Sequence, residues 1–186
     1  LEESLRQMSL WHQLDIGVRP SISVNISTGQ LNNLQFLSLL DSCIKKYDID
    51  SSYLKLELTE SVLMENNETM NTLINELNKR HIDLAIDDFG TGYSSLAYLN
   101  EIPVQQIKID KKFIDAIDST ANGEINEDAL EIAKATISLG KSLRKKITAE
   151  GVESRQQMDA LRKFNCDLAQ GYYISKPLHA DDAQAV

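Results

Sequence analysis

The sequence is poor in positive charge. Its 186 residues include 19 Lys and Arg against 28 Asp and Glu, so the formal net charge is −9. A protein that binds the backbone of DNA or RNA needs a stripe of Lys and Arg, so this balance argues against a nucleic-acid polymer as the partner. It leaves a small anionic ligand open, because bound divalent metal ions can reverse the sign of charge within a pocket.

Cysteine, histidine and long apolar runs are also scarce, and aromatic residues make up 6% of the chain. The two cysteines form no Cys-x-x-Cys pair, which indicates reduced thiols in a reducing compartment. No apolar run reaches the roughly 18 residues of a membrane span, and no signal peptide is visible. Because the chain begins with Leu1 and not with Met, we expect part of a longer protein, either cytoplasmic or the cytoplasmic portion of a membrane-bound one.

Alternating polar and apolar residues predict strands, and apolar residues at helical spacing predict helices. Strands are expected at residues 21–26, 53–58, 84–87, 106–110 and 146–150 and near 171–174. Helices are expected at residues 1–14, 34–47, about 67–80, 126–143 and 154–164, with a helical turn at 113–117 and a last helix beginning at 179. Strands that alternate with helices indicate right-handed βαβ units and a parallel sheet.

Polar residues gather at the C-terminal ends of the predicted strands. They are Asn25, Glu57, Asp87, Lys108 and Glu150, and Gln170 opens the sixth strand. In α/β barrels the active site is built at that end of the strands. A closed barrel has eight strands and about 250 residues. We therefore expect an α/β, TIM-like barrel that is incomplete: residues 1–186 form a single domain with about six of the eight strands, and the two N-terminal strands are missing.

The stretch Asp87-Asp88-Phe89-Gly90-Thr91-Gly92-Tyr93-Ser94-Ser95-Leu96 follows an apolar run at residues 82–86. Two adjacent carboxylates stand where the strand should end, and two glycines let the backbone turn sharply before a short predicted helix. Taken alone, such a pair is more often an acidic turn than a site. Paired acids are nevertheless hard oxygen ligands of the kind that suits Mg²⁺ or Mn²⁺.

Together, the strand-end residues could supply ligands for two metal ions. Asn25, Glu57 and Asp87 offer three oxygen ligands, and Asp87, Asp88 and Glu150 could hold a second ion if Asp87 bridges. Two ions about 3.5–4 Å apart are a standard means of hydrolysing phosphodiesters.

Lys108 lies between two apolar residues, Ile107 and Ile109. A solvated lysine at a strand end is the alternative interpretation. The apolar neighbours favour an inward-pointing side chain, whose charge would stand beside an attacking water.

Six segments carry these residues in a fixed order along nearly the whole chain. They are Val24-Asn25-Ile26-Ser27, Glu57-Leu58-Thr59-Glu60-Ser61, Asp87 to Leu96, Ile107-Lys108-Ile109-Asp110, Ala149-Glu150-Gly151-Val152-Glu153 and Gln170-Gly171-Tyr172. In this order and at this spacing the sequence resembles the EAL family of cyclic di-GMP phosphodiesterases.

The resemblance implies hydrolysis of cyclic di-GMP to linear pGpG with two Mg²⁺ or Mn²⁺ ions. For the residues it implies that Asn25, Glu57 and Asp87 hold one ion and Asp87, Asp88 and Glu150 the other, that Lys108 lies near the catalytic water, that Glu150 acts as general base, that Glu60 orders the loop after Asp88, and that Asp110, Glu153 and Gln170 line the substrate pocket. It also implies a homodimer through the loop and helix after Asp88, and an upstream sensory or GGDEF domain as a partner.

The sequence departs from the family at the Glu-Ala-Leu motif of the second strand, whose glutamate is a metal ligand there. Asp128-Ala129-Leu130 and Asp159-Ala160-Leu161 resemble that motif but fall within predicted helices. We therefore expect the 186 residues alone to be weakly active or inactive. Beside hydrolysis in the complete domain, two alternatives stay open: a catalytically inactive cyclic di-GMP receptor and a regulatory interaction domain.

Overall fold

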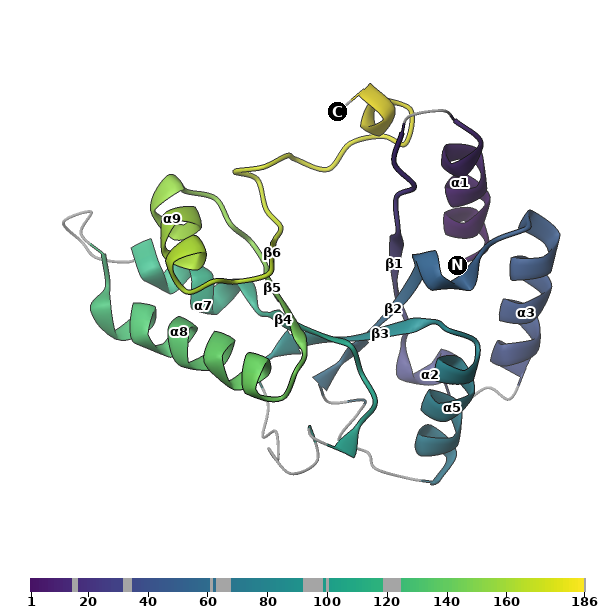
Figure 1. Ribbon diagram of the computed structural model, residues 1–186, viewed down its shortest axis with the longest axis horizontal. Coiled ribbons are helices and arrows are strands. Elements are labelled where there is room, and N and C mark those ends of the chain that lie inside the picture. The colour runs from purple at the N-terminus through teal and green to yellow at the C-terminus, as the bar shows by residue number, and fades with distance from the viewer. Residues whose placement is uncertain are drawn as a thin grey trace. The chain divides into compact units, whose positions relative to one another are not determined.

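The computed structural model describes residues 1–14, 17–31, 35–60, 62, 68–91, 99, 101–118 and 125–185 (Figure 1). Its strands are β1 (Ile22–Asn25), β2 (Leu54–Thr59), β3 (Asp83–Phe89), β4 (Gln106–Ile109), β5 (Lys146–Ala149) and β6 (Leu168–Ala169). Its α-helices are α1 (Glu2–Gln13), α2 (Thr28–Leu31), α3 (Gln35–Tyr47), α5 (Glu68–Lys79), α7 (Lys111–Asp115), α8 (Glu127–Ser142) and α9 (Arg155–Lys163), and short 3-10 turns are η1 (Ser51–Tyr53), η2 (Ala116–Asp118) and η3 (Asp182–Ala185).

The six strands follow the chain order in the sheet, and the pairings of β1 with β2, β4 with β5 and β5 with β6 are parallel. This confirms the α/β class, the expected number of strands and the approximate positions of the first five. Contacts divide the chain into two compact units, residues 1–85 with 179–186 and residues 86–178. Within the described ranges, no helix combines the length and apolar character that crossing a bilayer requires.

The first unit buries one side of its opening helix. Leu5 and Met8 of α1 are fully buried, and α1 contacts α3 and β1. The helical spacing of apolar residues in the sequence predicted this one-sided burial. On α3, the buried side chains are Phe36, Leu40 and Cys43.

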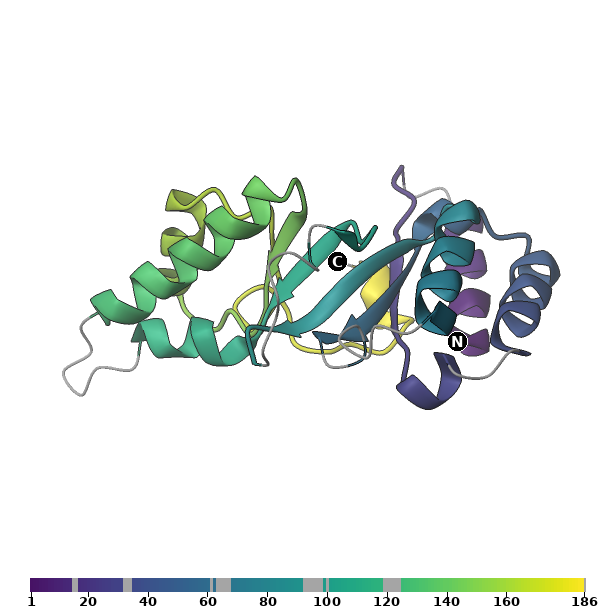
Figure 2. The ribbon, with the colours of Figure 1, turned by 90° about the horizontal axis from the view of Figure 1, so that it is seen from below.

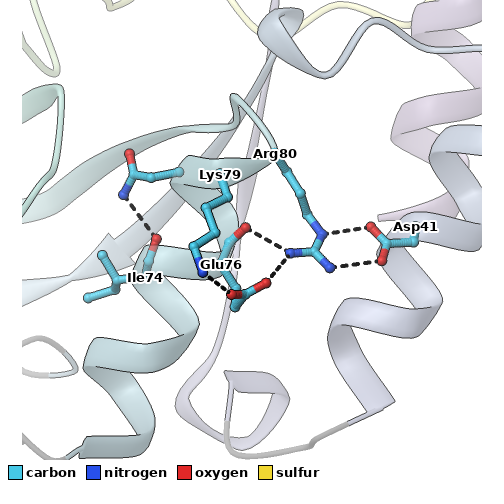
Figure 3. Close-up of polar contacts among 6 residues, drawn as sticks. Asp41, Ile74, Glu76, Lys79 and Arg80 are labelled. Carbon is cyan, nitrogen blue, oxygen red and sulfur yellow. Dashed lines mark hydrogen bonds and ion pairs between the residues drawn. The ribbon is translucent and has the colours of Figure 1, made fainter.

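Arg80, just after α5, joins α5 to α3 in the same unit (Figure 3). Its guanidinium donates to both carboxylate oxygens of Asp41, at 2.8 and 3.0 Å. It also donates to the side chain and the carbonyl oxygen of Glu76, each at 2.8 Å, and Lys79 donates to the same Glu76 side chain at 2.7 Å. The planar fork of arginine allows this arrangement, which an ammonium group could not reproduce.

In the second unit α7, α8 and α9 group beside β4 and β5 (Figures 1 and 2). Asn126 caps α8 by accepting a hydrogen bond from the backbone N–H of Ala129 at 3.2 Å. Further along α8, Gly140 lies so close to β5 that an added Cβ would collide with Ile147, and that position is 3.8 Å from the Cδ1 of Ile107 on β4. The isoleucine face of β4 and β5 is therefore covered by α8.

Three sequence predictions are corrected by the structure. β3 continues through Asp88 to Phe89 instead of ending at Asp87, and the last helix is reduced to the 3-10 turn η3. The sixth strand was expected near residues 171–174, but it lies at Leu168–Ala169, and residues 171–174 form a turn. After β6 the backbone bonds to the segment that follows β5: Val152 N–H donates to the carbonyl of Gln170 at 3.0 Å and Tyr173 N–H to that of Val152 at 2.9 Å.

One predicted feature lies outside the described residues. The short helix after Asp88 falls on residues 92–100, of which only residue 99 is described.

Candidate active site

Asp87 and Asp88 are consecutive residues of β3 whose carboxylates reach the same place. In a regular strand, successive side chains point to opposite faces. Asp88, however, has a φ of 54°, in the left-handed region, which breaks this alternation. Ligand oxygens of Asp87, Asp88 and Glu150 all lie within 4.8 Å of one another.

The turn after β3 requires glycine. Gly90 has a φ of 92°, and a Cβ there would stand 2.8 Å from the ring of Phe113 on α7. Thr91 closes the turn, since its backbone N–H and its hydroxyl both donate to the carbonyl of Asp88, at 3.3 and 2.9 Å. The glycine-rich sequence thus allows Phe113 to pack directly against the backbone that carries Asp88.

Lys108 of β4 reaches into the carboxylate group. Its ammonium lies 2.9 Å from Oδ1 of Asp87 and 2.6 Å from Oε1 of Glu150. The side chains of the three residues are 6%, 14% and 17% exposed. The structure therefore confirms that the Lys108 side chain points inward, and the alternative of a solvated lysine is wrong.

The pKa of the Asp88 carboxyl is raised by its surroundings. Desolvation raises the pKa of its carboxyl, and the neighbouring carboxylates of Asp87 and Asp110, together with a hydrogen bond to Asp110, raise it further. Lys108 acts in the opposite direction and lowers the pKa of Asp88. A further positive charge at this place would relieve the repulsion.

The donor set fits a divalent metal ion. Three carboxylates converge from β3 and from the residue after β5, and carboxylate oxygens are the ligands that Mg²⁺ and Mn²⁺ prefer. An ammonium group already lies between two of them, which shows that the position favours a cation. Asp87, Asp88 and Glu150 thus form a possible acidic metal-binding group.

Asn25 and Glu57 belong to the first unit, where they are register partners at the C-terminal ends of β1 and β2. Asn25 is exposed, and Glu57 is buried, as is Glu60 just after β2. Each unit therefore holds part of the predicted ligand set: this pair in one, and the three carboxylates in the other.

Asp110 borders the carboxylate group through a hydrogen bond with Asp88. Asp110 caps α7, accepting from the backbone N–H of Lys112 at 2.7 Å. Glu153 is ion-paired with Lys111, a residue that the sequence did not indicate. No pattern in the sequence links Lys111 to Glu153, because only the fold brings them together.

Gln170 is exposed directly after β6. Its backbone N–H donates to the carbonyl of Ala149 at 2.9 Å, which places this residue next to the end of β5. Gln106 is a second residue that sequence reasoning missed: it is buried at 4% exposure, and its position two residues before Lys108 could have revealed it.

The model of the EAL domain family matches residues 1–177. The protein belongs to the EAL domain family. The 186 residues do not contain the Glu-Ala-Leu sequence, and the two similar segments lie in α8 and α9, as predicted.

Curated relatives match this EAL chain along nearly its full length. It is 35% identical over 178 residues to the signaling protein YkoW of Bacillus subtilis, covering 96% of this chain and 21% of that protein. It is 34% identical over 186 residues to the bifunctional diguanylate cyclase/cyclic di-GMP phosphodiesterase MucR of Pseudomonas aeruginosa, covering 100% of this chain and 26% of MucR. The chain thus spans about a fifth to a quarter of the length of these relatives.

Solved EAL structures share the fold. A structure described as the PaMucR phosphodiesterase in complex with c-di-GMP has a TM-score of 0.89 at 32% identity, covering 98% of this chain and 71% of that one. The EAL domain of Mycobacterium smegmatis DcpA has a TM-score of 0.88 at 31% identity, covering 99% of this chain and 80% of that one. The similarity confirms the prediction of an incomplete TIM-like barrel.

Proposed function

We propose that this chain is part of an EAL domain that, when complete, hydrolyses cyclic di-GMP to linear pGpG with Mg²⁺ or Mn²⁺. One observation carries the proposal: three carboxylates whose ligand oxygens lie within 4.8 Å of one another, with the ammonium of Lys108 paired to two of them. The relative whose structure is described as a c-di-GMP complex supports the choice of substrate.

In this proposal the chain's own residues bind and orient. Asp87, Asp88 and Glu150 would hold one ion, and Asn25 and Glu57 are proposed as ligands of a second. When bound, two divalent ions would supply phosphate binding, activation of water and stabilisation of the leaving oxygen.

Lys108 and Glu150 would act on the attacking water. Lys108 would orient it, and Glu150 would accept its proton as general base. The water oxygen bonds to phosphorus while one phosphodiester P–O bond breaks, and the leaving oxygen takes up a proton from solvent. Asp110, Glu153 and Gln170 are proposed to line the substrate pocket, and Glu60 to order the loop after Asp88.

The test is cleavage of cyclic di-GMP by the full-length protein with Mg²⁺ or Mn²⁺, with pGpG measured by chromatography. Glu150→Gln is expected to lower kcat by about 100-fold or more, the usual contribution of a general base. The control Glu131→Gln changes a glutamate that is 67% exposed on α8 and should leave kcat unchanged.

Failure of the full-length protein to cleave would refute the proposal. Tight binding without turnover would instead favour the inactive receptor, against which stands the presence of Asn25, Glu57, Asp87, Asp88, Lys108 and Glu150. The 186 residues alone are expected to hydrolyse weakly or not at all.

Three expectations about the cellular setting remain predictions. We propose a homodimer through the loop and helix after Asp88, which light scattering of the purified domain would test. We also propose an upstream sensory or GGDEF domain and a cytoplasmic location. The relative MucR, a bifunctional diguanylate cyclase/cyclic di-GMP phosphodiesterase, is consistent with the upstream domain.

A further inference from the structure

A buried polar pair lies next to Lys108: Thr148 is its register partner on β5, and Gln106 precedes it by two residues on β4. Gln106 of β4 and Thr148 of β5 are 4% and 5% exposed, and the Nε2 of Gln106 donates a short hydrogen bond to the Oγ1 of Thr148. Buried polar side chains are costly unless they are bonded. Apolar side chains could fill the same volume without this cost, so the pair next to Lys108 is expected to have a role beyond packing.

The register of the sheet places this pair against the reactive groups. Lys108 and Thr148 are direct parallel partners, so their side chains lie on the same face. Gln106 precedes Lys108 by two residues, and Thr148 precedes Glu150 by two, which puts all four on that face. Two residues along a strand correspond to about 6.6 Å.

The opposite face of the same strands is apolar. Ile107 and Ile147 are buried against α8 near Gly140. The polar pair is therefore confined to the face that bears Lys108 and is not a general property of β4 and β5.

Lys108 needs such a support. Its side chain is long and rotatable, yet its ammonium is held between Asp87 at 2.9 Å and Glu150 at 2.6 Å. Thr148 is the register partner of Lys108 on the neighbouring strand, and Gln106 precedes Lys108 by two residues on the same face of β4. The hydrogen bond between them fixes the rotamers of both and so defines the surface from which the lysine stem rises.

We propose that Gln106 and Thr148 are positioning residues whose hydrogen bond holds the Lys108 ammonium between Asp87 and Glu150. The effect on catalysis rests on the proposed role of Lys108 in hydrolysis. The position of the Lys108 ammonium does not depend on that role and can be tested without any metal ion or substrate.

The test is the rate at which Lys108 is modified by acetic anhydride in the folded 186-residue chain, quantified by mass spectrometry. Thr148→Val removes the hydroxyl at nearly constant volume and is expected to raise the rate about fivefold, the change in an equilibrium that one lost hydrogen bond produces. Thr148→Ser keeps a hydroxyl and should retain the wild-type rate. Gln106→Met removes the donor of the same bond and decides the question if Thr148→Val does not fold.

Ile107→Val is the matched control, because it weakens packing on the other face of β4 without touching the polar pair. The exposed Lys134 serves as an internal standard for reagent reactivity. Lys108 reactivity in Thr148→Val and Gln106→Met no higher than in Ile107→Val would overturn the inference.

The complete domain supplies a second readout. Thr148→Val is expected to lower kcat with KM unchanged, by up to about 100-fold if the ammonium moves by about 1 Å. Increased Lys108 reactivity with unchanged kcat would support the positioning of Lys108 and count against its proposed role in the reaction.

Discussion

Replacing Lys108 by methionine tests whether the carboxylate group depends on its ammonium. Methionine preserves much of the length and apolar character of the stem and removes the charge. The substitution leaves Asp87 and Glu150, whose side chains are 14% and 17% exposed, without the cation that lies 2.9 and 2.6 Å from them. Asp88 stands in the same group with a pKa that is already raised.

The expected loss follows from this burial. Each contact between unit charges is worth about 4 kcal/mol at 4 Å in a medium of effective dielectric constant 20, and the cost of desolvation cancels part of that. Removing one partner of a buried pair typically costs about 3–5 kcal/mol, because a charge is left uncompensated. In a chain of this length each kcal/mol lowers Tm by about 2–4 °C, so Lys108→Met should melt about 6–20 °C below the parent protein.

The assay is thermal unfolding followed by circular dichroism at pH 7 in EDTA. Lys134→Met is the matched control, because Lys134 pairs with Glu131 at 3.0 Å but the two side chains are 49% and 67% exposed. An exposed pair contributes at most about 1 kcal/mol. Equal melting of the two variants would refute the reasoning, whereas Mn²⁺ is expected to recover part of the loss in Lys108→Met by neutralising the same carboxylates.

Three further substitutions test other parts of the structure. Asp88→Asn should raise Tm of the metal-free protein at pH 7, because it removes a carboxylate whose pKa is raised in the folded state. Such a group contributes stability at low pH that is lost as pH rises through its folded-state pKa, so the ionised form is unfavourable at pH 7. A gain in Tm that persists at pH 3 would contradict this. Gly140→Ala should lower the free energy of unfolding by up to about 2 kcal/mol, since the added Cβ meets Ile147. Adding Ile147→Val to that variant should recover stability, which a double-mutant cycle measured by denaturant unfolding would show. Arg80→Lys should lower the free energy of unfolding by about 1 kcal/mol in the same denaturant measurement, because lysine cannot make the two bonds to Asp41. A free energy of unfolding equal to that of the parent protein would contradict that.

The strands were predictable wherever one face is polar and the other apolar. On β4, Lys108 alternates with Ile107 and Ile109, and the structure has this strand at Gln106–Ile109. The sixth strand was misplaced because residues 171–174 look like a strand in composition. The backbone N–H of Tyr173 instead donates to the carbonyl of Val152 after β5, and that of Ile174 donates to the carbonyl of Gly171 within the turn. A sequence does not show which partner a backbone N–H will find.

The sequence by itself determined which residues stand at the ends of the strands, and their order was enough to indicate the EAL family. Only the tertiary structure decided which of them meet. Asp87 and Asp88 share one place because a φ of 54° at Asp88 reverses the alternation of the strand, and Lys108 lies between Asp87 and Glu150 because three strands bring their ends together. The physical reason is that local patterning specifies which face a residue takes, whereas the distances that set charge and chemistry arise from contacts between residues far apart in the chain.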